Sequence, residues 1–256
     1  MIPITKAKRI VIKLGTGILR TDQGIINNDC IVRLCKEIDR LKKSGIEVIL
    51  VSSGAIGLGM GRLKISKRPT ELSELQACAA IGQSQLINLW QKNLDLYKIN
   101  AAQILLTRED LASDKRYGAV TNTIDQILSS GAVPIVNEND TVSAEEIKFG
   151  DNDTLSALVA KATHADLLLI LSNIPGLMDI NNQNAIIPII ESISPEIEAL
   201  ATGTNNETSV GGMISKLSAA KIALESQCGV FIGSGNDHEL FNKMFEAQPV
   251  GTYFKP

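Results

Sequence analysis

The chain has 256 residues, of which 44% are apolar, and a formal net charge of −3. This length and composition suffice for a compact core and exclude a disordered chain. The mildly acidic balance, without a long run of Lys or Arg, gives no sign of nucleic-acid binding and favours small-molecule partners.

Targeting and metal signals are equally sparse. No apolar run reaches the roughly eighteen residues of a membrane span and no signal-peptide cleavage site is found, so we expect a cytoplasmic protein without membrane contact. The two histidines, His164 and His238, are predicted to be structural, because they have neither zinc-site spacing nor the partners of a Ser-His-Asp relay. The cysteines form no C-x-x-C pair and are expected to be buried thiols in a reducing compartment: Cys30, Cys35, Cys78 and Cys228.

Strand and helix patterns alternate along the chain. A strand is predicted over 9–14 (RIVIKL), then a helix over 28–43 that Asn27 or Asn28 caps and Gly45 ends, then a strand over 47–51. Further strands are predicted over 101–106, 132–136, 167–171, 230–233 and near 250–254, helices over 72–97, 117–129, 153–163 and 213–227, and an apolar run over 185–190. The alternation predicts a parallel sheet in a single α/β domain with two lobes.

The first strand ends in VIKLGTG, with Lys13 followed by Gly15 and Gly17. Glycines at the end of a parallel strand let the backbone present N–H groups to an anion, and a lysine adds a point charge. A tight turn beside a lysine that extends to solvent is the alternative. The dinucleotide-binding fingerprint is not met, because Arg20 stands where its third glycine would fall.

The second strand leads into SSGAIGLGMG, residues 52–61. Each glycine would cost a helix roughly 1 kcal/mol relative to alanine, so a close-packed backbone or a bound ligand is expected here. Ser52 and Ser53 could cap a helix, but we favour binding of a carboxylate or a phosphate.

A third glycine-rich turn is SVGGMISK, residues 209–216. Gly211 and Gly212 open a helix whose N-terminus carries about half a positive charge, and Lys216 lies one turn inside it. A glycine hinge before a surface helix is the alternative. Together, Lys13 and Lys216 would provide the two positive charges that a polyphosphate requires.

The stretch NENDTVSAEEIKFGDND, residues 137–153, gathers acids and amides ahead of an apolar helix. One of Asp151, Asn152 and Asp153 is expected to be the N-cap of that helix. Glu145 and Glu146 fit ordinary surface charges. The remaining acids could orient the lysines, bind a metal through water, or receive the ammonium of a zwitterionic substrate.

Seven segments give the chain a resemblance to a known family: IKLGT (12–16), VSSGAIGLG (51–59), QACAAIGQSQL (76–86), LLTRED (105–110), PIVNENDTV (134–142), EIKFGDNDTLSALVA (146–160) and GGMISKLSAAKIA (211–223). They resemble the amino acid kinase family, in the branch that transfers phosphate from ATP to the γ-carboxylate of L-glutamate, the first step of proline biosynthesis. The resemblance implies a three-layer αβα sandwich with a mainly parallel central sheet. It also implies a glutamate-binding lobe over about 1–165 and an ATP-binding lobe over about 166–256.

The resemblance further implies residue roles. Lys13 and Lys216 would contact the ATP phosphates, with Asp153 holding both, as the catalytic residues. Glutamate would be bound by Ser53, Gly54, Asp140 and Asn152. ATP would be bound by Lys13, Gly15, Ser172, Asn173, Val210, Gly211, Gly212, Met213, Ile214, Ser215 and Lys216. Mg²⁺ is expected through the ATP phosphates, without a protein metal site.

Departures from the family pattern keep alternatives open. Relatives usually carry Thr-Asp at Ser172-Asn173 and Gly-Thr at Ser209-Val210, which bears on nucleotide affinity. A sensor that binds nucleotide or amino acid without transfer, or a kinase of another small molecule, is therefore the competing interpretation. The family also implies a homo-oligomer (dimer or tetramer) and feedback inhibition by proline through the region 62–83. The C-terminal PUA domain of many relatives is expected to be absent.

Overall fold

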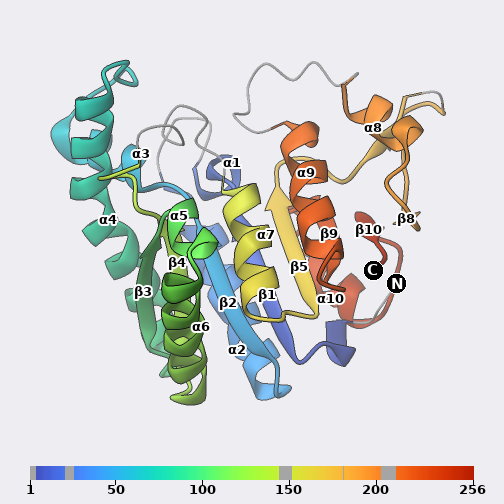
Figure 1. Cartoon of the computed structure of the whole chain (residues 1–256), viewed down its shortest axis with the longest axis horizontal. Helices are drawn as coiled ribbons and strands as arrows, with labels where there is room; N and C mark the ends of the chain where they lie inside the picture. Colours follow the sequence, from blue (N-terminus) through green and yellow to red (C-terminus); the bar gives the residue numbers. More distant parts are fainter. Residues whose placement is uncertain (1–3, 21–25, 144–151, 181, 203–211) are drawn as a thin grey trace.

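The computed structural model describes residues 4–20, 26–143, 152–180, 182–202 and 212–256. Within these ranges, eight strands form one sheet in the order β3-β4-β2-β1-β5-β9-β10-β8 (Figure 1). Their bounds are β1 Arg9–Leu14, β2 Glu47–Ser52, β3 Ala101–Leu106, β4 Val133–Glu138, β5 Leu167–Ser172, β8 Ile189–Ile190, β9 Gly229–Ser234 and β10 Thr252–Phe254. Neighbouring strands are parallel except β9 and β10, which confirms the predicted α/β class with a mainly parallel sheet.

Helices cover both faces of this sheet and give three layers. One core cluster joins the sheet to α2 (Asn28–Lys43), α4 (Leu72–Leu94) and α10 (Leu240–Phe245). The opposite cluster joins it to α6 (Asp114–Ser129), α7 (Asp153–Ala162) and α9 (Met213–Leu224). Figure 1 shows α6, α7 and α9 in front of the sheet and α2 behind it.

Successive residues of β1 point to opposite layers, as the pleat of a strand requires. Ile10, Ile12 and Leu14 belong to the α2 layer, whereas Val11 belongs to the α7 and α9 layer. Lys13 has the same parity as Val11. Its side chain is therefore directed toward α7 and α9.

Local signals explain where α2 begins and ends. The Asn27 side chain accepts a hydrogen bond from the Cys30 backbone N–H at 3.1 Å, so Asn27 is the cap. Gly45 follows the helix with φ +79°, a conformation that only glycine adopts without strain. Both boundaries agree with the sequence-based prediction.

Gly59, after β2, and Gly82 allow two helices to pack closely. Gly59 lies in α3 (Ala55–Leu63) and Gly82 in α4, and these helices pack along each other. A β-carbon on Gly59 would overlap the backbone of Cys78, and one on Gly82 would overlap the carbonyl of Ala55. Contact between two helix backbones compensates for the low helix propensity of glycine. A close-packed backbone or a bound ligand was expected for this stretch, and the close-packed backbone is confirmed at Gly59.

The sequence patterns did not predict several of the shorter helices and strands. They are η1 (Ile4–Lys6), α1 (Thr16–Leu19), α3, α5 (Arg108–Ala112), β6 (Met178–Asp179), α8 (Pro195–Thr202) and α10. The helix expected over 72–97 gives way after Leu94 to the 3₁₀ turn η2 (Asp95–Tyr97). The run 185–190 divides at Pro188 into β7 (Ala185–Ile186), which pairs with β6, and β8, which joins the main sheet.

The order of the strands creates a crevice at their carboxyl ends. From β1 the chain passes to β2 on one side, and it later returns through α7 to β5 on the other side. Leu14 pairs with Ser52 of β2 and with Leu171 of β5, so the three strands end at one level. Ligands of doubly wound sheets bind at such a reversal of strand order.

The thiols lie inside the fold, as predicted. All four cysteines are buried and free, and burial raises the pKa of Cys35 and of Cys228 to about 12. In the described ranges, the helices lack the combination of length and apolar character that a membrane crossing demands.

Candidate active site

Three charged side chains meet beyond the carboxyl end of β1. Lys13 Nζ lies 2.5 Å from Asp153 Oδ1, and Lys216 Nζ lies 3.0 Å from Asp153 Oδ2. The residues are 3%, 5% and 0% exposed, respectively. Ionised groups at this depth require opposite charges and hydrogen bonds nearby. We call these three residues the lysine cluster; together they carry one excess positive charge, which suits an anionic ligand.

The fold brings the lysine cluster together from three elements. Lys13 is the fifth residue of β1, Asp153 is the first residue of α7, and Lys216 lies in the first turn of α9. The helices α7 and α9 pack side by side on the layer toward which Lys13 points. Ser215 adds a hydrogen bond of 2.8 Å from its hydroxyl to Asp153 Oδ2. The N-termini of both helices therefore lie near the same point.

A second group of side chains is joined by amide hydrogen bonds. Asn152 Nδ2 donates to Asn137 Oδ1 at 2.8 Å and to Ser53 Oγ at 3.1 Å. Asn137 Nδ2 in turn donates to Gln83 Oε1 at 3.0 Å. The indole N–H of Trp90 donates to Ser52 Oγ at 3.1 Å inside the core. These contacts fix the orientation of the Asn152 amide and of the turn after β2.

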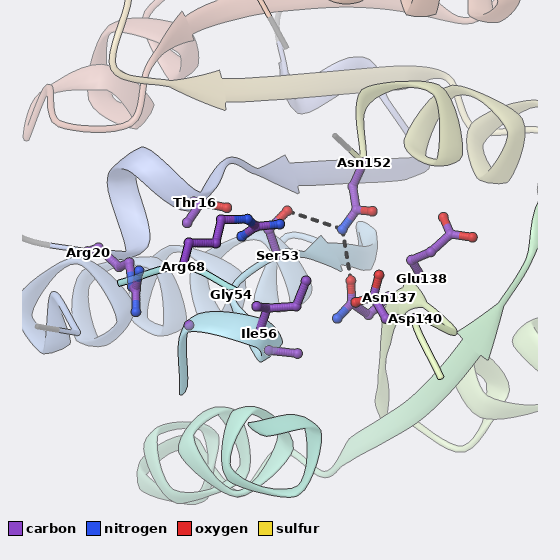
Figure 2. Close-up of a pocket in the computed structure, with 12 residues that line it drawn as sticks. Thr16, Arg20, Ser53, Gly54, Ile56, Arg68, Asn137, Glu138, Asp140 and Asn152 are labelled. Atoms are coloured by element: carbon purple, nitrogen blue, oxygen red, sulfur yellow. Dashed lines mark hydrogen bonds between the residues drawn. The ribbon is translucent and has the colours of Figure 1, made fainter. Parts of the chain in front are cut away.

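The amide group borders a cavity, which we call the polar pocket (Figure 2). Its lining is Thr16, Arg20, Ser53, Gly54, Ala55, Ile56, Gly57, Arg68, Asn137, Glu138, Asp140 and Asn152. In Figure 2, Asn137, Glu138 and Asp140 lie on one side of Ser53, and Arg20 and Arg68 on the other. The polar pocket adjoins the lysine cluster, because Asn152 precedes Asp153 in the chain.

All four residues predicted to bind glutamate line this one pocket: Ser53, Gly54, Asp140 and Asn152. Two further acids of the same stretch, Glu145 and Glu146, and also Asp151, lie outside the described residues. Asn139 has a local structural role, because its Oδ1 accepts a hydrogen bond from Thr141 Oγ1 at 2.6 Å. The concentration of acids and amides in the sequence thus has several structural roles.

The described residues predicted to bind ATP lie in the turn after β1, at the end of β5 and at the start of α9. Ser172 ends β5, and its hydroxyl accepts from the Ile174 N–H at 3.3 Å. Asn173 lies beside the turn after β1, because a β-carbon on Gly17 would be 3.8 Å from its Cγ. Gly212 precedes α9, whose first residues are Met213, Ile214, Ser215 and Lys216. Val210 and Gly211 lie outside the described residues.

Three local expectations need correction or refinement. The Gly15 N–H donates to the Leu171 carbonyl at 3.1 Å, so this amide holds the turn to β5. Helix α3 has Gly54 at its N-cap, with φ +112°, and a serine cap is therefore wrong. Asn152 does occupy the N-cap of α7, but its side chain makes no capping hydrogen bond because the amide faces Ser53 and Asn137.

Sequence reasoning missed five polar residues of the pocket as binding residues: Thr16, Arg20, Arg68, Asn137 and Glu138. Asn137 and Glu138 belong to a stretch that was recognised, and their place at the end of β4 could have selected them. Arg20 and Arg68 are 48 positions apart, and neither is set in a motif. Only the fold brings these two guanidinium groups to one cavity.

The described residues contain no group of three or more His, Cys, Asp or Glu side chains arranged to hold a metal ion. Asp153 directs both of its carboxylate oxygens to lysine ammonium groups. Mg²⁺ in phosphoryl-transfer sites is commonly held by one or two carboxylates together with substrate phosphates and water. This donor set is compatible with an ion that enters on the nucleotide.

The fold and these two adjoining sites define a phosphotransferase class. The model of the amino acid kinase family matches residues 8–234. The chain belongs to the amino acid kinase family.

The following curated relatives are each named glutamate 5-kinase. The chain is 45% identical to the one from Carboxydothermus hydrogenoformans, with 99% of this chain and 69% of the relative covered. The chain is 43% identical to the relative from Clostridium acetobutylicum, with 99% of this chain and 96% of the relative covered. It is 42% identical to the relative from Caldanaerobacter subterraneus subsp. tengcongensis, with 97% of this chain and 68% of the relative covered.

Proposed function

We propose that this protein transfers the γ-phosphoryl group of ATP to the γ-carboxylate of L-glutamate and forms L-glutamyl 5-phosphate, the first step of proline biosynthesis. The observation that carries the proposal is the junction at Asn152-Asp153. One residue borders a pocket with acids and amides, and the next holds two buried lysines. A zwitterionic acceptor and a polyphosphate can therefore meet at one point.

The acceptor lies in the polar pocket in this proposal. Asp140 receives the α-ammonium group, and Ser53, Gly54 and Asn152 contact the rest of glutamate. Support comes from the hydrogen bonds that hold the Asn152 amide against Ser53 and Asn137, since a fixed amide orients a polar ligand with little loss of entropy. The N-terminal lobe, about residues 1–165, provides these groups.

The nucleotide lies on the C-terminal lobe, about residues 166–256. Ser172 and Asn173 meet it at the end of β5, together with Gly15 and the segment 210–216. Lys13 and Lys216 contact its phosphates. Their separation across Asp153 supports this role, because one carboxylate keeps both ammonium groups directed to the same region.

The chemistry requires no general base. A glutamate γ-carboxylate has a reference pKa of about 4.3 and is already a nucleophile at neutral pH. One of its oxygens forms a bond to the γ-phosphorus while the bond from that phosphorus to the bridging oxygen of ADP breaks. The obstacle is repulsion between two anions, which the lysine cluster lowers by charge and by alignment. Mg²⁺, bound through the ATP phosphates, would supply further charge neutralisation.

The reaction can be tested directly. We expect the protein with ATP, Mg²⁺ and L-glutamate to produce an acyl phosphate that hydroxylamine traps as the hydroxamate. Binding of both ligands without product would instead identify a sensor. Product with another acceptor, and none with glutamate, would identify a different kinase of this fold.

Lysine variants test the proposed roles. Lys13→Ala and Lys216→Ala should each lower turnover by about 10²- to 10³-fold, as loss of one preorganised donor commonly does. Lys221→Ala is the matched control, because Lys221 lies on the same helix and pairs at the surface with Glu198. Wild-type turnover in either of the first two variants would overturn the role of that lysine.

Regulation and assembly are further parts of the proposal. We expect proline to compete with glutamate through the region 62–83 and the enzyme to be a homo-oligomer, a dimer or a tetramer, in the cytoplasm. The buried free thiols are compatible with a reducing compartment. An unchanged rate with millimolar proline at low glutamate would reject the inhibition.

A further inference from the structure

Two arginines enter the polar pocket on the side opposite Asp140. Arg20 follows the short helix α1, and Arg68 lies between α3 and α4. Figure 2 shows the Arg68 side chain extending along the pocket toward Ser53, with Arg20 beside its base. Arg20 is partly buried, whereas Arg68 is exposed at the opening. Neither residue belongs to the amide group or to the lysine cluster.

The fold makes room for the Arg20 guanidinium. A β-carbon on Gly57 would overlap its Nη2, Nε and Cζ atoms, so the planar group rests on the bare backbone of α3. Burial, followed by the positive charge of Arg68, lowers the pKa of Arg20. The two cations lie on the same side of the pocket, where their positive charges favour a bound anion.

The chemistry of this pair defines its ligand. A guanidinium group matches a carboxylate with two parallel hydrogen bonds, and its charge persists at any physiological pH. We propose that Arg20 and Arg68 form a subsite for the α-carboxylate of the acceptor amino acid. Asp140 then receives the α-ammonium group from the facing wall, and the γ-carboxylate is left to approach the lysine cluster.

This division of the pocket gives specificity for an α-amino acid that bears a second, distal carboxylate. The opposite charges on the α-carbon meet walls of opposite sign, Asp140 on one side and the arginine pair on the other. A dicarboxylate without the ammonium group would offer no charge partner to Asp140. An amino acid amide would offer none to the arginine pair. Such a mismatch leaves a charged protein group without its ligand and is discriminated against strongly.

The inference rests on the proposed glutamate kinase activity. A second acceptor distinguishes failure of the arginine subsite from failure of that activity. L-Glutamate α-amide keeps the γ-carboxylate and the ammonium but replaces the α-carboxylate with a neutral amide. Hydroxamate formation would be measured with both acceptors for the wild type, Arg20→Met and Arg68→Met. Binding of both acceptors to each protein would be measured by calorimetry.

We expect each variant to raise the KM for glutamate by about 10- to 100-fold, the scale of a charge-assisted hydrogen bond. The KM for the α-amide should change much less, since a neutral amide has neither the negative charge nor the second acceptor oxygen that a carboxylate offers to a guanidinium group. Arg116→Met is the matched control, because Arg116 is an exposed arginine of α6 that lies outside both the pocket lining and the region 62–83. This control variant should leave the KM for both acceptors unchanged.

Gly57→Ala tests the subsite without removing a charge. The added methyl group must displace the Arg20 guanidinium, so this variant should also weaken the binding of glutamate more than the binding of the α-amide. Equal losses for both acceptors in the arginine variants would overturn the subsite while leaving the kinase activity established. A wild type that neither binds nor phosphorylates glutamate would overturn the proposed function, and the subsite with it. Binding without turnover still tests the subsite, by the same calorimetric comparison.

Discussion

The lysine cluster and the polar pocket lie next to each other but are built on different physical principles. The cluster consists of full charges, almost without exposure, that come from β1, α7 and α9. The pocket is held mainly by neutral amides and opens to solvent, where Arg68 is exposed. Charge stabilisation and orientation are thus separated in space. Changes in the cluster should act on turnover, and changes in the pocket on acceptor binding.

The largest effect is expected from Asp153→Asn, which would remove the charge between the two lysines. Turnover should fall by about 10²- to 10³-fold, because the lysines lose the group that aims them. The free energy of unfolding should fall by roughly 3–5 kcal/mol, as removal of one partner from a buried ion pair typically costs. Urea denaturation and the hydroxamate assay measure the two quantities.

The control for this variant is Asp125→Asn. Asp125 pairs with Arg9 at 3.0 Å but is 54% exposed, so this change should cost less than about 1 kcal/mol. If Asp153→Asn were no more harmful than this surface change, the lysine cluster would not depend on its carboxylate.

A smaller effect of a different kind is expected from Asn137→Ala. This variant removes the acceptor of the Asn152 amide and also the link to Gln83. The KM for glutamate should rise about 2- to 10-fold, the scale of a neutral hydrogen bond, with the KM for ATP unchanged. Asn242→Ala, at the surface near Arg40, is the control. A rise in the KM for ATP alone would contradict the proposed separation of the lysine cluster from the polar pocket.

The smallest effect on activity is expected beneath the pocket. Trp90 and Ser52 can be replaced by Phe and Ala, singly and together, and unfolding measured for all three variants. The hydrogen bond between them predicts a coupling free energy of about 1 kcal/mol and less than a twofold change in turnover. Additive losses of stability would mean that this bond does not secure the turn after β2.

The sequence predicted those parts of the molecule that have a strong local signal. The strand over 9–14 and the helix over 28–43 agree with the structure at both ends, since apolar periodicity, Asn27 and Gly45 all act locally. The short helices α5 and α8 were missed because five or eight residues carry too little periodicity to predict. Pro188 was not recognised as the point at which one apolar run joins two different sheets.

The site shows the same distinction. Lys13 and Lys216 could be selected because each follows or enters a glycine turn, whereas the role of Asp153 was implied by the resemblance to the family. Arg20 and Arg68 carry no comparable signal. Their convergence depends on how α1 and the connection from α3 to α4 pack beyond the sheet. Long-range packing of this kind is not encoded in the spacing of a motif.

In the proposed function, the lysine cluster and the polar pocket bind two substrates that react with each other. The most direct measurement is a crystal structure with a non-hydrolysable ATP analogue, Mg²⁺ and L-glutamate. We predict that Lys13 Nζ and Lys216 Nζ both lie at about 2.7–2.9 Å from oxygens of one triphosphate, with the glutamate γ-carboxylate in line with its terminal phosphorus. A triphosphate contacted by neither lysine, or glutamate bound outside the polar pocket, would contradict the account.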